Sequence, residues 1–278
     1  MAKTNFKFKD FSIMGKISIF LLIALILIAV VAPFLNLHPY KTPSGKSLEA
    51  PSSKHILGTD DLGIDLFSQL VNGARISLII GLSTGIGSTI LGCLLGVLSG
   101  YYGKIIDAVI MRITDVMLAL PSLPLMILVA SFLGPSLKNI VIILTIFSWT
   151  SIARLIRSKV IQLKEEDYIK MAKSYGANFY YLFQKHFFRE LYPILAISVM
   201  RIVGRAIISE ASLSFLGLGD PTSKSWGLIL NYSINFRGIY FTDYWKWWVL
   251  APLGATMILV SSISIISKDM ERIFDGRL

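Results

Sequence analysis

Two arginines and a glutamate interrupt a run from Tyr192 to Leu218 that is otherwise uncharged. Arg201 and Arg205 are four residues apart, so on a helix they share one face, and Glu210 follows them. The run is long enough to cross a membrane, and Arg201 lies about ten residues into it, near mid-membrane at about 1.5 Å per residue. A charge at that depth faces protein or water and not lipid.

These three charged residues have two interpretations. In the functional one they line a polar translocation path, where the arginines favour the passage of substrates that carry a carboxylate, such as peptides. In the structural one the arginines pair with Glu210 or with Asp115. The sequence leaves both open.

Residues with the spacing of a catalytic or nucleotide-binding site are not found. A P-loop requires G-x-x-x-x-G-K-[ST], and the nearest segment, Gly45-Lys46-Ser47, has Tyr40 at the position of the first glycine. The sequence contains no H-E-x-x-H motif, and its histidines lie outside the apolar runs: His38, His55 and His186. One cysteine excludes an internal disulfide framework and a cysteine-built zinc site. We therefore expect that the chain is not an enzyme and that it binds no metal or cofactor itself.

A basic segment between the fourth and fifth apolar runs predicts an amphipathic helix. Four of its residues recur at the i, i+3, i+4, i+7 spacing of one helix face: Tyr168, Met171, Ala172 and Tyr175. Acids at positions 165–167 lie in its first turn, where the helix dipole favours them, and Gly176 is placed to end it. Such a helix lies either on a membrane surface or against a partner protein.

Three glycines in the second apolar run predict close helix packing. Gly92, Gly96 and Gly100 are four residues apart and share one helix face. Small residues let a neighbouring backbone approach, which matters in lipid because the hydrophobic drive between helices is absent. The neighbour is either a helix of the same chain, which we favour, or a helix of a second subunit.

Six apolar runs predict an all-α membrane protein with six spans. A spanning helix needs about 20 mostly apolar residues. The runs are Ile17–Leu37, Ile76–Tyr102, Val116–Leu137, Ile140–Ala153, Tyr192–Leu218 and Trp247–Ser267. Prolines interrupt the third, and the fourth is short. The first resembles a signal peptide with a cleavage site at Ala29–Ala32, but its length and the spans that follow favour an uncleaved helix.

The distribution of positive charge predicts the topology. Six spans put both ends of the chain on one side. With that side inside, the inner segments carry 17 of the Lys and Arg residues and the outer loops carry 8. By the positive-inside rule, both termini are expected in the cytoplasm. Aromatic residues near the outer end of the sixth run would then form an interfacial belt: Trp226, Tyr244, Trp245, Trp247 and Trp248.

The composition agrees with a membrane protein. Hydrophobic residues make up 54% of the chain and charged residues 16%, with a mean hydropathy of +0.66. These values argue against an ordinary soluble enzyme and exclude intrinsic disorder. The net charge of +10 alone would also fit a nucleic-acid or anionic-lipid partner. We divide the chain into residues 1–75, with the first span and an outer loop, and a transmembrane domain of residues 76–278 with a cytoplasmic loop at about 154–191.

Three motifs resemble a known family. The run from Ser209 to Gly219, followed by Ser225-Trp226-Gly227, is similar to the E-A-S-L-S-F-L-G-L-G…S-W-G signature of inner-membrane permease subunits of bacterial ABC importers for dipeptides, oligopeptides and nickel. Residues 57–78 and 100–121 resemble two further motifs of these permeases. The resemblance covers most of the chain from His55 onward.

The resemblance implies a type I ABC importer permease fold and a coupling loop that docks on an ATPase. The residues that this assigns to the loop are Glu166, Tyr168, Met171, Ala172, Tyr175, Gly176 and Ala177. The family's Glu-Ala-Ala falls on Lys170-Met171-Ala172, so only Ala172 and Gly176 keep the pattern. Ile64 replaces the usual arginine of an outer L-G-R-D motif, so no role transfers to it.

The resemblance also implies partners and a location. These are a second homologous permease, two cytoplasmic ATPase subunits that hold ATP and Mg, an extracytoplasmic substrate-binding protein and the lipid of the bacterial cytoplasmic membrane, with no nucleic acid. Together they would move di- or oligopeptides inward by alternating access. The alternative is the same architecture importing nickel or another metal–chelate complex.

Overall fold

The computed structural model describes residues 10–31 and 38–275. Helices make up almost all of this part of the chain, and its one β feature is an isolated bridge between Thr59 and Asp65. The helices in chain order are α1 (Ile13–Val31), α2 (Leu66–Tyr102), α3 (Lys104–Ala119), α4 (Ser122–Leu133), α5 (Leu137–Lys164), α6 (Asp167–Ser174), α7 (Phe179–Leu182), the π-helix η3 (Phe183–Phe187), α8 (Phe188–Phe215), α9 (Trp226–Asn235), the 3₁₀-helix η4 (Arg237–Tyr240), α10 (Trp245–Trp248) and α11 (Leu250–Asp275).

Five of the described helical stretches are long and apolar enough to cross a membrane, and a sixth arises if one bent pair counts as a span. The all-α expectation is confirmed. The first expected span is seen as α1, while residues 32–37 of that prediction lie outside the described residues.

The third expected span needs correction. The prediction was one apolar run, Val116–Leu137, interrupted by prolines and preceded by an inner segment at residues 103–115. The chain instead forms α3 from Lys104 and then α4, bent by 95° from each other. The bend lies at Leu120–Pro121. A residue before proline is pushed out of the helical region, and Leu120 has φ −88° and ψ 143°.

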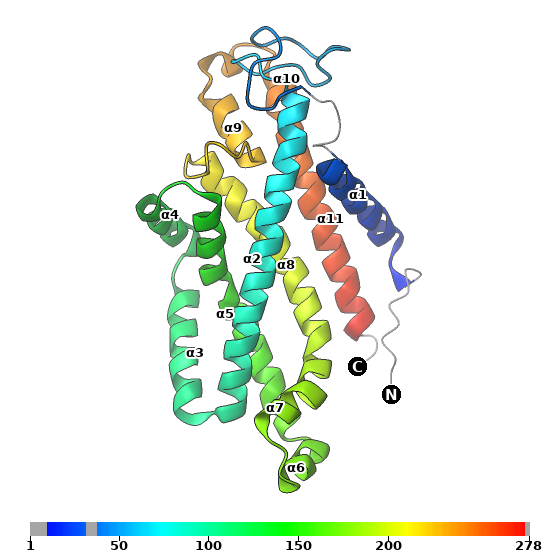
Figure 1. The fold of residues 1–278 in the computed structure, drawn as a ribbon, viewed down its shortest axis with the longest axis vertical. Helices are drawn as coiled ribbons and strands as arrows, with labels where there is room; N and C mark the ends of the chain where they lie inside the picture. Colours follow the sequence, from blue (N-terminus) through cyan, green and yellow to red (C-terminus); the bar gives the residue numbers. More distant parts are fainter. Residues whose placement is uncertain (1–9, 32–37, 276–278) are drawn as a thin grey trace.

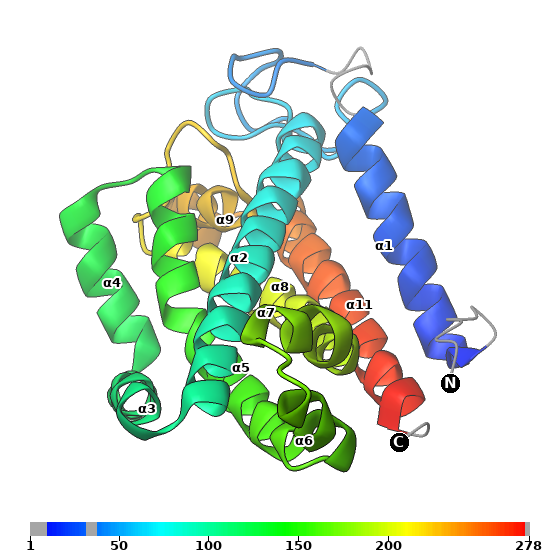
Figure 2. The same cartoon turned by 60° about the horizontal axis from the view of Figure 1, so that its bottom comes forward.

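The core is built around α2, which runs through the middle of the bundle between α5 and α8 (Figure 2). Asp65 caps its first turn, because its carboxylate accepts a 2.8 Å hydrogen bond from the Ser68 amide. Glycines on α2 allow both neighbours to approach. A Cβ at Gly85 would lie 2.7 Å from Val203 of α8, and a Cβ at Gly92 would lie 2.7 Å from Ile152 of α5.

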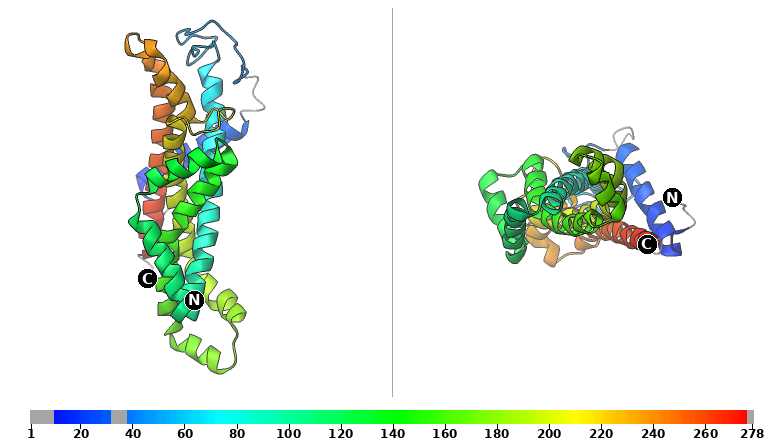
Figure 3. Two further views of the ribbon diagram at one scale, coloured as in Figure 1. Left: turned by 90° about the vertical axis from the view of Figure 1, so that its left-hand side faces the viewer. Right: turned by 90° about the horizontal axis from the view of Figure 1, so that it is seen from below.

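The two ends of the bundle differ. At one end α6 projects beyond the long helices, and α7 lies beside the end of α2, while α9, α10 and the loop of residues 38–65 gather at the other (Figures 1 and 3). Trp226 and Trp248 are each 1% exposed, so they belong to the core and not to the predicted interfacial belt. The Trp226 indole donates to the Leu70 carbonyl at 2.8 Å, which ties α9 to α2.

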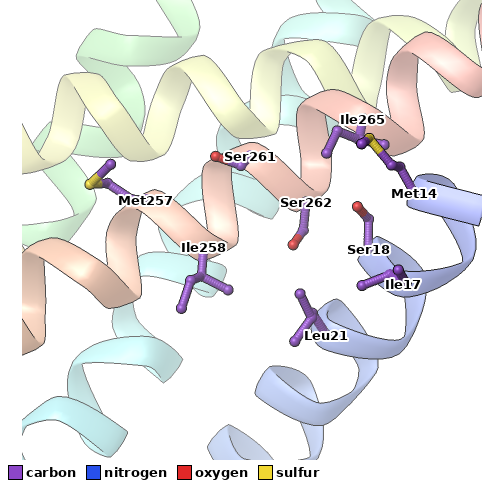
Figure 4. Close-up of a pocket in the computed structure, with 9 residues that line it drawn as sticks. All are labelled: Met14, Ile17, Ser18, Leu21, Met257, Ile258, Ser261, Ser262 and Ile265. Carbon is purple, nitrogen blue, oxygen red and sulfur yellow. The ribbon is translucent and has the colours of Figure 1, made fainter.

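Helix α1 stands at the edge of the bundle beside α11 (Figure 2). Its start is fastened by Asp269 of α11, which accepts hydrogen bonds from the Ser12 amide at 2.9 Å and the Ser12 hydroxyl at 2.6 Å. Beyond this cap the two helices line an open, largely apolar groove of about 290 Å³, whose lining includes Ser18 and Ser262 (Figure 4). One polar attachment therefore anchors a helix that is otherwise largely exposed.

Candidate functional site

The two arginines of the fifth predicted span lie in a groove between α8 and α11. The groove has a volume of about 490 Å³. Its polar lining comes from Arg201 and Arg205 on α8 and from Ser264, Ser267, Lys268 and Glu271 on α11. Both arginines are exposed in this chain, whereas the residues between them on the helix are buried. The groove is thus positively charged and open on one side.

The two arginines, which share one set of interpretations in the sequence, have different partners in the structure. Arg201 forms an ion pair with Glu271. Arg205 makes no ion pair or hydrogen bond with any residue that the structure describes. Ser267, which also lines the groove, is 4% exposed, and its hydroxyl has no hydrogen-bond partner among those residues. The groove therefore holds both a neutralised cation and an unneutralised one.

Neither acid that was considered as a partner for the arginines fills that role. Asp115 of α3 pairs with Arg154 of α5 at 2.6 Å. Glu210 is 1% exposed and accepts a 2.7 Å hydrogen bond from the Ser214 hydroxyl one turn along α8. The structure does not bring Glu210 to the groove.

Glu210 instead lies where α9 packs on α8. The residue after it, Ala211, presents its backbone to Gly227 in the first turn of α9, with no room for a side chain at that glycine. The two halves of the sequence signature, one around Glu210 and one around Trp226-Gly227, are therefore in contact. This placement gives the signature a structural role in joining α8 to α9.

Sequence reasoning missed a second polar cluster between α3 and α5. The Asp107 carboxylate accepts hydrogen bonds from Arg157 Nε at 2.5 Å and from Arg157 Nη2 at 2.6 Å. The Ser99 hydroxyl also donates to this carboxylate, at 2.5 Å. A bidentate arginine–carboxylate pair fixes orientation as well as distance. The available signal was the set of acids and arginines near the ends of apolar runs, but which of them pair depends on how α3 packs against α5.

The glycines Gly92, Gly96 and Gly100 lie against α5 of the same chain. A Cβ at Gly96 would lie 2.6 Å from the Ala153 carbonyl oxygen, and one at Gly100 would lie 2.9 Å from that of Arg157. Backbone atoms cannot move aside as a flexible side chain can. The stripe therefore holds α2 and α5 at close distance.

The projecting segment begins with α6, which ends in a Schellman motif. Gly176 has φ +86°, its amide donates to the Lys173 carbonyl at 2.9 Å, and the Ala177 amide donates to the Ala172 carbonyl at 3.0 Å. Asn178 then caps α7 by accepting from the Tyr181 amide at 2.9 Å. The chain thus makes a tight corner between two short helices.

The predicted face of α6 divides into buried and exposed parts. Of the four predicted residues, Ala172 is partly buried, whereas Tyr168, Met171 and Tyr175 are exposed by 44%, 59% and 85%. Ile169, which the prediction did not include, is the fully buried residue of the helix. Glu166 precedes α6 as its N-cap residue without a side-chain cap hydrogen bond. Met171 and Tyr175 thus form an exposed surface of α6, and Tyr168 borders it with its ring 5.5 Å from that of His186.

The segment is tied to the ends of α2 and α5. The Lys164 ammonium donates to the Tyr101 carbonyl at 2.7 Å, and Lys173 lies over the Tyr101 ring at 4.9 Å. Burial, and then the positive charge of Lys164, lower the pKa of Lys173 below that of an exposed lysine. The corner between α6 and α7 is therefore a packed structure attached to the bundle.

A bundle of membrane-length helices with a charged groove and a projecting helical corner defines a multi-pass membrane transport subunit, and the comparisons agree. Residues 92–278 match the family described as "Binding-protein-dependent transport system inner membrane component". The chain belongs to this family.

Relatives match over nearly the whole chain. The dipeptide transport system permease protein DppC of Alkalihalophilus pseudofirmus is 37% identical over 94% of this chain and 85% of its own length. The oligopeptide transport system permease protein OppC of Bacillus subtilis is 32% identical over 95% of this chain and 86% of its own length. A putative peptide permease protein of Brucella suis is 34% identical over 82% of this chain and 75% of its own length. The protein is therefore a multi-pass membrane permease subunit of this family.

Proposed function

We propose that this chain is one of two permease subunits of an ATP-driven importer and that both of its termini are cytoplasmic. The positive-inside count supports the orientation, since it places the α6–η3 end inside. That end would meet two ATPase subunits, which hold ATP and Mg. The opposite end, with α9 and the loop of residues 38–65, would receive substrate from the extracytoplasmic binding protein.

The observation that supports the ATPase contact is the exposed surface of Met171 and Tyr175, bordered by Tyr168, on a projecting helix. Exposed apolar patches on ordered elements mark interaction sites. Ile169 on the same helix is fully buried and holds α6 against the bundle. A displacement of α6 by a protein bound to its exposed side would therefore be transmitted to the helices of the bundle.

The need for a second permease is supported by the groove. Exposed arginines in a membrane-spanning helix cannot face lipid, so another protein surface or water must lie opposite Arg201 and Arg205. A homologous permease placed against α8 and α11 would enclose a path between the subunits.

Peptides are the substrate class that we propose. The support comes from the relatives, whose names refer to dipeptide, oligopeptide and peptide transport. Import of nickel or another metal chelate has no such support among these relatives.

The proposal is tested by charge substitution on the α6 surface. Met171→Glu and Tyr175→Glu should prevent co-purification of the ATPase subunits and abolish ATP-driven peptide uptake. Tyr240→Glu, at a similarly exposed aromatic residue near the other end, should retain the ATPases. ATPase binding that survives both α6 substitutions would refute the coupling role.

A further inference from the structure

The groove between α8 and α11 contains one arginine without a counter-charge. Its lining carries three cations, Arg201, Arg205 and Lys268, and one carboxylate, Glu271. The Arg201–Glu271 ion pair uses that carboxylate. Arg205 and Lys268 remain, and no acidic side chain of the described residues pairs with either.

The same groove offers a hydrogen-bond donor. Ser267 is 4% exposed and its hydroxyl has no partner among the described residues, whereas the Ser264 hydroxyl already donates to the Val260 carbonyl at 2.8 Å. Gly204 of α8 also lines the groove and faces Ile263 of α11, which a Cβ at this position would meet at an ordinary contact distance of 3.4 Å. A guanidinium with a nearby hydroxyl suits a planar carboxylate, to which arginine binds through two parallel hydrogen bonds.

We propose that Arg205, assisted by Lys268 and Ser267, binds the C-terminal carboxylate of the peptide as it passes through the groove. The proposal rests on the peptide-import function. Every linear peptide with a free C-terminus carries this group whatever its side chains. A cation at this place would therefore accept many sequences while rejecting solutes without an anionic group. Arg201 takes a different role and holds α8 to α11 through Glu271.

The test uses the complete transporter in proteoliposomes. The binding protein is loaded with each probe and added at a concentration that saturates the transporter. The probes are trialanine and trialanine amide, which differ in the C-terminal charge. Arg205→Gln should lower ATP-driven uptake of trialanine by about tenfold or more, the usual effect of losing a hydrogen bond to a charged group, and change amide uptake less than twofold. Arg205→Lys should keep most of the preference for the free acid.

Two control variants separate this role from a structural one. Arg112→Gln removes an exposed cation from α3, outside the groove, and should leave both uptake rates unchanged. Arg201→Gln should lower the stability of the complex, because it leaves Glu271 unpaired, but it should not change the ratio of acid to amide uptake. Membrane levels and basal ATPase activity confirm that each variant is assembled.

The outcomes distinguish the inference from the function on which it rests. An equal loss for both peptides in Arg205→Gln would overturn the inference and indicate that Arg205 pairs with the second permease. An unchanged trialanine rate would also overturn it. If the wild-type transporter moves neither peptide while its ATPases remain bound, peptide import itself is refuted.

Discussion

Alanine at Gly96 should destabilise the bundle, whereas alanine at Gly87 of the same helix should not. At Gly96 the new methyl group would lie 2.6 Å from the Ala153 carbonyl oxygen and 2.8 Å from Ile156 Cβ. At Gly87 its nearest neighbours are Thr145 side-chain atoms at 3.3 Å. Both sites face α5, so the comparison isolates the closeness of the contact.

The expected difference follows from opposing terms. Replacing a helical glycine with alanine gains about 1 kcal/mol of helix propensity at either site, so this gain cancels in the comparison. Relieving the contact at Gly96 requires α2 and α5 to separate by several tenths of an ångström. Overpacking of this kind typically costs about 1–3 kcal/mol. The Gly96→Ala protein should be less stable than the Gly87→Ala protein by about that amount.

Thermal unfolding of the purified permease complex in detergent, followed by tryptophan fluorescence, measures the effect. The midpoint for Gly96→Ala should fall below that for Gly87→Ala by on the order of 5 °C, since about 1 kcal/mol shifts a domain of this size by a few degrees. Equal midpoints would show that α2 and α5 are not packed through this stripe, and the inferred role of Gly92 and Gly100 would fail with it.

Three other substitutions have defined outcomes. Gly176→Ala should cost about 1–2 kcal/mol of local stability, because φ +86° is unfavourable for a residue with a Cβ. Hydrogen exchange of the backbone amides after α6 should become faster, and Gly176→Asn should have a smaller effect. Unchanged exchange would contradict the Schellman motif at this corner. Asp269→Ala should release the start of α1, because it removes the acceptor of the Ser12 hydrogen bonds, at a cost of about 0.5–2 kcal/mol of stability. Limited proteolysis should then cleave the chain near Ser12 more readily, and unchanged resistance to protease there would contradict this anchoring role. Alanine substitutions of Asp107 and Arg157, singly and together, should give a coupling energy of about 0.5–3 kcal/mol in a double-mutant cycle, and simple additivity would contradict their pairing.

Features that depend on neighbouring residues could be predicted from the sequence. The end of α6 at Gly176 is one, since glycine adopts positive φ without a side-chain penalty and the need for it arises within one turn. The apolar runs predicted the helices for the same reason, because burial of about 20 successive residues is a local property of the chain. Their ends were missed where a helix continues beyond the apolar part, as α5 does to Lys164.

Partners that are distant in sequence could not be predicted. The structural interpretation, one of the two left open, paired the arginines with Glu210 or Asp115. The partner of Arg201 is instead Glu271 on another helix, and which helix faces α8 is set by the packing of the whole bundle. Trp226 was placed in an interfacial belt because of its residue type. Its burial depends on the contact between α9 and α2, which no local pattern encodes.

The connectivity of the helices offers a mechanical reason why one chain carries both the α6 surface and the groove. The corner that contains Gly176 is joined directly to α5 before it and, through α7 and η3, to α8 after it, so that Phe179–Phe215 forms one continuous apolar stretch. Arg205 lies 26 residues beyond Phe179 on this stretch, a distance of about 40 Å at the helical rise. A displacement of the corner by a bound ATPase would therefore be carried to the groove by a helix, and not by a flexible linker. Close contacts fasten α2 both to α5, at the glycine stripe, and to α8, where a Cβ at Gly85 would lie 2.7 Å from Val203. The groove lies on the other side of α8, against α11, so a displacement of α8 relative to α11 would change the width of the groove at Arg205.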